Sequence, residues 1–95
     1  MVARPYFDPV LTGENLRRIR KMHHKSVEAI REYMELESTQ AVYKWEQGKC
    51  FPTVDNFVAL ARMYDMHVEE LLVEVPRTSI VLCGDNYFFL VRRYT

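Results

Sequence analysis

Apolar residues recur every three or four positions along five successive stretches of the chain, a spacing that places them on one face of a helix. Leu16, Ile19 and either Met22 or His23 predict a first helix over residues 13–23. Four further stripes predict helices over residues 27–35, 39–48, 54–64 and 68–73: Val27, Ile30 and Met34; Ala41, Val42 and Trp45; Val54, Phe57, Leu60, Ala61 and Tyr64; Val68, Leu71 and Leu72. The pattern therefore indicates a mainly α domain of five helices.

Residues that favour helix ends stand at the boundaries of these stretches. The predicted N-caps, whose side chains can accept a hydrogen bond from a first-turn amide, are Thr12, Ser26, Ser38, Thr53 and, less usually, His67. Gly48 can adopt the left-handed conformation that closes a helix, and Pro52 excludes continued helix. Phe51 is expected to fill the core. The third helix is thus short, with its polar residues facing outward: Thr39, Gln40, Tyr43, Lys44 and Gln47.

Both ends of the chain differ from this helical part. Residues 1–11 hold two prolines and no helical period, which predicts an irregular arm. Tyr6, Phe7 and Leu11 are expected to pack on the domain. Alternatively, Arg4 could reach a DNA phosphate or the minor groove, but a single arginine favours packing. The chain is therefore divided into an arm (1–11), a helical domain (12–75) and a C-terminal extension (76–95).

The extension has β-branched and aromatic residues on both sides of Gly84-Asp85-Asn86, which predicts a β-hairpin or strand extension. An isolated hairpin is marginally stable in water, so it must pack on something. It could pack on the domain's own helices or pair with a second copy. We favour a homodimer, because two linked copies can hold two partner sites at once. Arg92 and Arg93 could instead protect a strand edge.

Charge and composition narrow the class of protein. The 95 residues carry 13 basic and 13 acidic side chains, and this neutrality argues weakly against a non-specific nucleic-acid binder. However, basic residues gather in 15–25 and acidic ones in 55–74. No apolar run reaches the about 18 residues of a membrane span, and no secretory signal is evident. These features predict a cytoplasmic protein whose two cysteines, Cys50 and Cys83, stay reduced.

Catalytic and ligand-binding patterns are absent from the sequence. His23 and His24 are adjacent and diverge on a helix, and no other metal-ligand spacing occurs. There is no glycine-rich phosphate loop or serine elbow. We therefore expect no enzyme activity, no metal, no cofactor and no small-molecule ligand.

The run Trp45-Glu46-x-Gly48-Lys49-x-x-Pro52, followed by Leu60-Ala61 and Glu70-Leu71-Leu72, resembles the phage-repressor and Cro-like helix-turn-helix family, also called the xenobiotic-response-element type. The resemblance covers about residues 13–73. It implies a compact helical domain whose third helix, here 39–48, enters the DNA major groove. It also implies that Arg20 pairs with Glu46 and ties the first helix to the third.

The side chains on the third helix suit DNA recognition. Thr39, Gln40 and Lys44 can bond base edges. The predicted phosphate contacts are Tyr43, Gln47, Lys49 and the helix starts at Ser26 and Ser38. The sequence thus predicts a sequence-specific, double-stranded DNA-binding transcriptional regulator. Its operator, and whether it represses or activates, stay open.

Several residues depart from the family pattern. Val27 replaces a glutamine that often contacts phosphate, and Arg31 replaces a small residue in the middle of the second helix. Glu35 replaces a turn glycine, and Glu37 lengthens the turn, so that a left-handed residue need not be used there. These departures, the neutral charge and the apolar extension keep an alternative open. In it, the same fold is a protein-interaction module, such as an antitoxin-like or regulatory partner, that binds little DNA.

Overall fold

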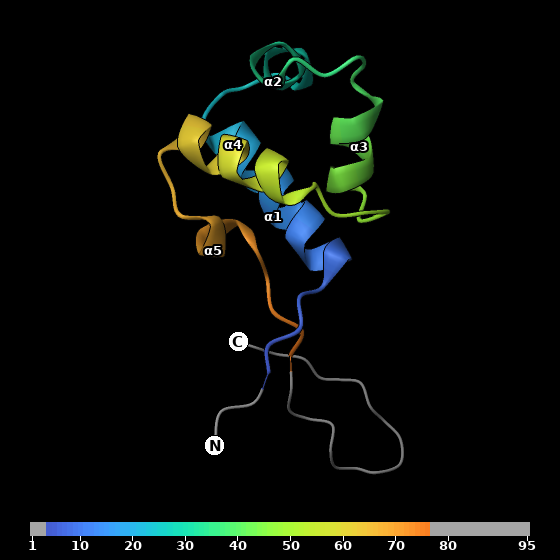
Figure 1. The fold of residues 1–95 in the computed structure, drawn as a ribbon, viewed down its shortest axis with the longest axis vertical. Coiled ribbons are helices and arrows are strands. Elements are labelled where there is room, and N and C mark those ends of the chain that lie inside the picture. Colours follow the sequence, from blue (N-terminus) through green and yellow to red (C-terminus); the bar gives the residue numbers. More distant parts are fainter. Residues whose placement is uncertain (1–3, 77–95) are drawn as a thin grey trace.

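The computed structural model describes residues 4–76, which form five helices (Figure 1). They are α1 (Pro9–Met22), α2 (Val27–Met34), α3 (Gln40–Glu46), α4 (Val54–Tyr64) and α5 (Val68–Leu71). The mainly α, five-helix prediction is confirmed. The predicted hairpin lies outside the described residues. Within residues 4–76, no helix is long and apolar enough to cross a membrane.

Helix α1 begins four residues earlier than predicted, inside the segment assigned to the arm. The Asp8 carboxylate caps it, accepting hydrogen bonds from the amides of Val10 (2.8 Å) and Leu11 (3.0 Å). Pro9 fits the first helical position, where a missing amide hydrogen costs nothing. Thr12 is therefore not the cap. It is buried in the helix, and its Oγ1 accepts a bond from the Val73 amide (3.0 Å).

Helices α2 and α4 begin where their predicted caps place them. Ser26 Oγ accepts a bond from the Ala29 amide at 3.0 Å, and Thr53 Oγ1 accepts one from the Asn56 amide at 3.4 Å. Both helices end on a non-glycine residue in the left-handed conformation, Glu35 and Asp65, each with a φ of 57°. The expectation that the longer turn after α2 would avoid this conformation is wrong. Glu35 adopts it without the freedom of glycine.

Helix α3 is shorter than the predicted 39–48, and its start is displaced by one residue. Thr39, not Ser38, occupies the N-cap position, with a helical φ of −75°. Ser38 Oγ accepts a bond from the Gln40 amide at 3.3 Å, so its hydroxyl still serves the helix start. Gly48 ends the segment with a φ of 77°, as predicted. Helix α5 is also short, and Glu70 Oε1 accepts a bond from the His67 amide at its start (2.8 Å).

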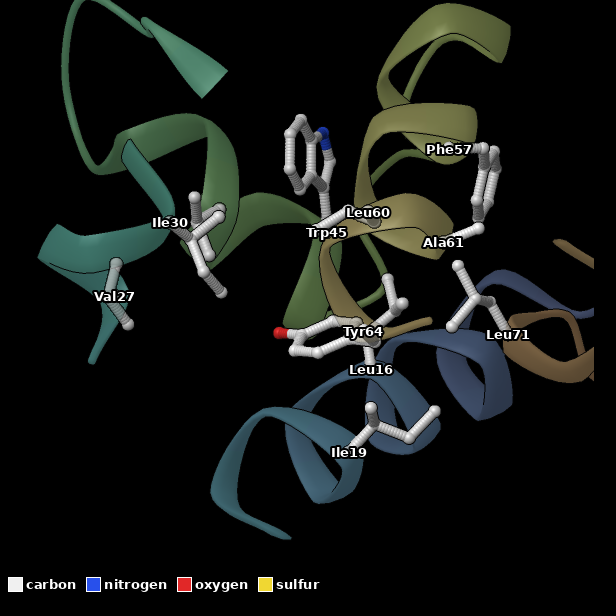
Figure 2. Close-up of a cluster of buried hydrophobic side chains, with 11 residues drawn as sticks. Leu16, Ile19, Val27, Ile30, Trp45, Phe57, Leu60, Ala61, Tyr64 and Leu71 are labelled. Carbon is white, nitrogen blue, oxygen red and sulfur yellow. The ribbon is translucent and has the colours of Figure 1, made fainter. Parts of the chain in front are cut away.

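One apolar cluster joins all five helices (Figure 2). Trp45 of α3, Leu60 of α4 and Leu16 of α1 are among its members, and α2 contributes Val27 and Ile30. Two core predictions are wrong. Val54 stands at the first position of α4, beyond the edge of the core, and is 78% exposed. Phe51 is 38% exposed, although its ring centroid lies 6.2 Å from that of Phe57.

The two ends of the described chain lie side by side in Figure 1. Phe7 and Glu74 form an antiparallel β-bridge, flanked by bonds from the Asp8 amide to the Val73 carbonyl (2.9 Å) and from the Val75 amide to the Tyr6 carbonyl (2.7 Å). The arm is thus held by its backbone rather than by the predicted packing of Tyr6, which is exposed. The Arg4 guanidinium lies 5.1 Å from the Tyr6 ring centroid, a cation–π contact.

Candidate nucleic-acid interface

Helix α3 has one buried face and one exposed polar face. Val42 and Trp45 are 2% and 5% exposed, because their spacing directs both into the core. Gln40, Tyr43, Lys44 and Gln47 are exposed on the opposite side, and Thr39 is half-buried at the helix start. A seven-residue helix is too short to be stable alone, so its buried face must hold it in place. The result is a fixed helix that presents four polar side chains to solvent.

Arg20 and Glu46 link α1 to α3. Arg20 Nη1 also donates to the carbonyl of Lys25 (3.1 Å), so one guanidinium joins α1, α3 and the turn between α1 and α2. The hydrogen bonds to Glu46 raise the pKa of Arg20, whereas partial burial opposes that shift. The side chains of Arg20 and Glu46 are only 12% and 7% exposed, so each charge needs the other to offset its loss of hydration. This pair fixes α3 against α1 and is not available to contact DNA.

Gly13 allows α1 and α3 to approach closely. A Cβ atom at this position would lie 2.7 Å from the carbonyl oxygen of Glu46 and closer still to that of Trp45. Both are backbone atoms, which cannot rotate away as a side chain can. The α1–α3 contact therefore requires glycine here, a requirement that the apolar pattern of the sequence does not reveal.

The turn between α2 and α3 is held by Arg31. Its Nη1 donates to the Leu36 carbonyl (3.1 Å), while Nε and Nη2 donate to Glu28 Oε2 (2.9 and 2.6 Å). The family has a small residue at this position, whereas here the larger Arg31 holds the turn by hydrogen bonds. In the sequence, Arg31 stands out only as a departure from the family pattern. The signal for its role was Glu28, three residues earlier on the same helix face.

The remaining predicted site residues lie around α3. Lys49 is exposed in the loop that follows Gly48, and Ser38 is exposed immediately before the helix. Ser26 is exposed at the start of α2, with its hydroxyl engaged by the Ala29 amide. The structure therefore gathers Gln40, Tyr43, Lys44 and Gln47 on one face, with Lys49 and Ser38 at the two ends of α3 and Ser26 on the neighbouring helix.

Charges of both signs surround the polar face. Lys44 and Lys49 are exposed cations, whereas α2 and the turn expose four acids: Glu28, Glu32, Glu35 and Glu37. Glu28 is paired with Arg31, which lowers its pKa through their hydrogen bonds. Within residues 4–76, no group of three or more His, Cys, Asp or Glu side chains could hold a metal ion. The chemistry on this surface is hydrogen bonding by amide, hydroxyl and ammonium groups.

Comparison with known proteins supports this architecture. No protein-family model and no curated protein matches the chain. Among solved structures, the restriction-modification controller protein C.AhdI from Aeromonas hydrophila is similar with 28% identity and a TM-score of 0.61, covering 67% of this chain and 96% of that one. The DNA-binding domain of BldD is similar with 28% identity and a TM-score of 0.59, covering 70% of this chain and 94% of that one.

A third similar structure is the DNA-binding domain of BldD from S. venezulae. It shows 28% identity and a TM-score of 0.59 over 70% of this chain and 97% of that one. Each of the three comparisons spans at least two thirds of this chain. In its five-helix order, its Trp45-to-Pro52 motif and its likeness to these structures, the chain is similar to helix-turn-helix proteins of the phage-repressor and Cro-like family.

Proposed function

We propose that this protein is a transcriptional regulator that binds double-stranded DNA sequence-specifically through α3. The observation that carries the proposal is the exposed polar face of α3, held rigidly by the burial of Trp45 and by the Arg20–Glu46 pair. A helix of this kind fits the major groove, whose width admits one α-helix. The similar structures support it, because two of them are described as DNA-binding domains and one as a controller protein.

Base recognition is assigned to three residues at the start and middle of α3. Gln40 can bond adenine through both the oxygen and the nitrogen of its side-chain amide, and Lys44 can donate to guanine. Thr39 offers a hydroxyl for a base edge and a methyl group for thymine. Gln40 and Lys44 are four positions apart, so they lie on the same helix face. Both side chains are exposed in the protein, as direct readout requires.

Phosphate binding is assigned to residues at the rim of that face. Tyr43, Gln47 and Lys49 carry the hydroxyl, amide and ammonium groups that commonly contact the DNA backbone. The first-turn amides after Ser26 and Ser38 add positive partial charge at the starts of α2 and α3. These contacts would position α3 without reading sequence, and Lys49 would contribute the most to salt dependence.

The proposal includes a homodimer formed through the C-terminal extension. Two copies would place two α3 helices on two half-sites of one operator, which raises the affinity of each for its site. The extension, residues 76–95, is proposed for this role because its predicted strands could pair with those of a second copy. Such a regulator would act in the cytoplasm and would need no catalytic group or cofactor.

A second candidate function is a protein-interaction module that uses the same fold. It is favoured by the four exposed acids on α2 and the following turn, which would repel phosphates. Val27 adds to this, because it is buried where a phosphate-binding side chain would be expected. A basic protein partner, rather than DNA, would complement such a surface.

Salt titration of DNA binding separates the two functions. The full-length protein is titrated with random duplex DNA and with duplexes selected from a random pool, at several salt concentrations. We expect affinity for random DNA to fall steeply as salt rises, because phosphate contacts release counterions. Selected sequences should bind more tightly and show two half-sites with a common spacing. No binding to either DNA, even at low salt, would rule out the regulator and favour the interaction module.

A further inference from the structure

An open apolar groove of about 420 Å³ lies along α4 and α5. Its lining includes Phe7, Phe51, Val54, Phe57, Val68 and Leu72. Three of these large side chains are well exposed: Val54 (78%), Phe7 (39%) and Phe51 (38%). An apolar groove with exposed side chains of this kind gains free energy when another apolar surface removes it from water.

The chain leaves the described structure at the rim of this groove. Leu72 lines the groove, and Glu74 is bridged to Phe7, which also lines it. The description ends at Pro76, two residues after Glu74. The next apolar run begins at Ile80, and four extended residues span about 13 Å. Residues 77–95 of the same chain therefore start next to the groove and carry apolar side chains within reach of it.

The apolar residues of this segment exceed what a hairpin can bury by itself. In a strand, alternate side chains point to opposite faces. The predicted second strand would place Tyr87, Phe89 and Val91 on one face and Phe88 and Leu90 on the other. Both faces are thus apolar, and at least one of them must pack against another surface to be buried away from water. The groove is the matching apolar surface on the same chain.

The segment and the rim of the groove carry opposite charges. Glu69 and Glu74 are exposed acids that line a neighbouring hollow together with Phe7 and Leu72, two residues of the groove. The segment carries three arginines, Arg77, Arg92 and Arg93, against one acid, Asp85. Two copies that met groove to groove would instead bring like charges together, which is unfavourable. Charge complementarity therefore favours the segment over the groove of a second copy.

We infer that residues 77–95 dock in cis on the α4–α5 groove, with one apolar face of the predicted hairpin covering Val54 and Phe51 and its arginines near Glu69 and Glu74. This docking does not depend on DNA binding. It leaves a strand edge of the hairpin available for pairing with a second copy. In the inferred arrangement, the segment extends the apolar core of residues 4–76.

The two cysteines provide a direct test, because Cys50 is exposed next to Phe51 and Cys83 lies within the segment. Equal amounts of ¹⁵N-labelled and unlabelled protein are unfolded and refolded together, so that any dimer combines the two isotopes at random, and the mixture is then treated with a short bismaleimide. Peptide mass spectrometry then identifies the Cys50–Cys83 product and its isotope pairing. We expect this product to form rapidly within single chains, so that the joined peptides are both labelled or both unlabelled.

Two lysine variants show whether the groove is responsible. Val54→Lys places a charge in the groove at an exposed helix position, where it should not disturb folding; circular dichroism checks this. It should slow the intramolecular product by roughly tenfold, which corresponds to about 1.4 kcal/mol of docking free energy. Tyr33→Lys, at an exposed position on α2 outside the groove, should leave the rate unchanged. Reaction of Cys50 with N-ethylmaleimide in each variant corrects for changes in thiol reactivity.

The remaining outcomes overturn the inference. An unchanged rate in Val54→Lys would mean that the segment reaches Cys50 without docking in the groove. Products that join labelled to unlabelled peptides in the proportion expected for exchange between chains would assign the groove to a second copy. No Cys50–Cys83 product at all would place the segment elsewhere.

Discussion

Arg20 and Glu46 meet through two parallel hydrogen bonds, from Nε to Oε2 at 2.6 Å and from Nη2 to Oε1 at 3.1 Å. The two residues are 26 positions apart in the chain and belong to different helices. A two-pronged contact fixes direction as well as distance, because the guanidinium and carboxylate groups are both planar. The orientation of α3, and with it the direction of its exposed side chains, is therefore set from α1.

Replacing Glu46 by glutamine should destabilise the domain strongly. The substitution keeps the shape of the side chain but leaves the Arg20 charge partly buried without its counter-charge, at a cost of about 3 kcal/mol. Urea unfolding of both proteins measures this difference. Glu28→Gln is the matched control, because it breaks the exposed Glu28–Arg31 pair and should leave stability nearly unchanged. Equal effects of the two substitutions would contradict the role assigned to Glu46.

Replacing Gly13 by alanine should also destabilise the domain, although alanine normally favours a helix. The added methyl group would meet the backbone carbonyls of Trp45 and Glu46 and push α3 away from α1. Overpacking of this kind costs about 1–3 kcal/mol. Thermal unfolding provides the measurement, with Glu14→Ala at the adjacent exposed position as the control. A Gly13→Ala protein more stable than the wild type would show that the two helices can separate freely.

Stability should fall at high pH because of Tyr64. Burial of the phenol, with a smaller contribution from the Glu46 carboxylate, raises the pKa of Tyr64 to about 12. The unfolded chain loses this proton near pH 10, so between about pH 10 and 12 only the folded state retains it. The contribution of Tyr64, roughly 2 kcal/mol, is present below pH 10 and lost across that interval.

Comparison of Tyr64→Phe with the wild type isolates this effect. The variant has no phenol at this position, so its free energy of unfolding should decline less between neutral pH and about pH 11. Tyr33→Phe, at an exposed site, should follow the wild type. Identical pH profiles for Tyr64→Phe and the wild type would exclude the contribution of Tyr64.

Replacing Gln40 by alanine should reduce the sequence preference of DNA binding. The loss of a paired contact to one base should cost roughly 1–3 kcal/mol at the selected site and leave binding to random duplex DNA unchanged. Competition binding with selected sites carrying each of the four base pairs at the affected position measures this. If discrimination persisted at every position of the site, Gln40 would not be a base-reading residue.

Replacing Lys49 by alanine should weaken binding to all DNA sequences alike. Removal of one phosphate contact should reduce the slope of log affinity against log salt by about one. Lys21→Ala is the control, because Lys21 is exposed on α1 and has no assigned contact. A loss confined to the selected site, with an unchanged salt slope, would move Lys49 to the base-reading group.

The sequence predicts the helices best where a polar cap and an apolar stripe agree. Ser26 and Thr53 are followed at once by amphipathic stretches, and α2 and α4 start directly after them. The pattern does not predict the start of α1, because the two prolines in residues 1–11 and the lack of a helical period there indicate an irregular arm. Proline interrupts the interior of a helix but fits its first turn. The position of a proline, rather than its presence, therefore determines whether a helix can include it.

Features that depend on contacts between distant residues were less predictable. The exposure of Val54 follows from where the core ends, not from its place in the apolar stripe. The requirement for Gly13 and the turn contacts of Arg31 arise only once the helices are packed. In contrast, the outward face of α3 was predictable, because Trp45 and Val42 determine which side of the helix is buried.

The bridge between Phe7 and Glu74 has a consequence for how the domain can be combined with other proteins. Both described ends emerge side by side, at the end of the molecule opposite α2 in Figure 1. A tag, reporter or second domain fused in place of the residues before 4 or after 76 would therefore start from the same pole. It would leave α2 and its turn unobstructed, and joining the ends by a linker would need to span only a short gap.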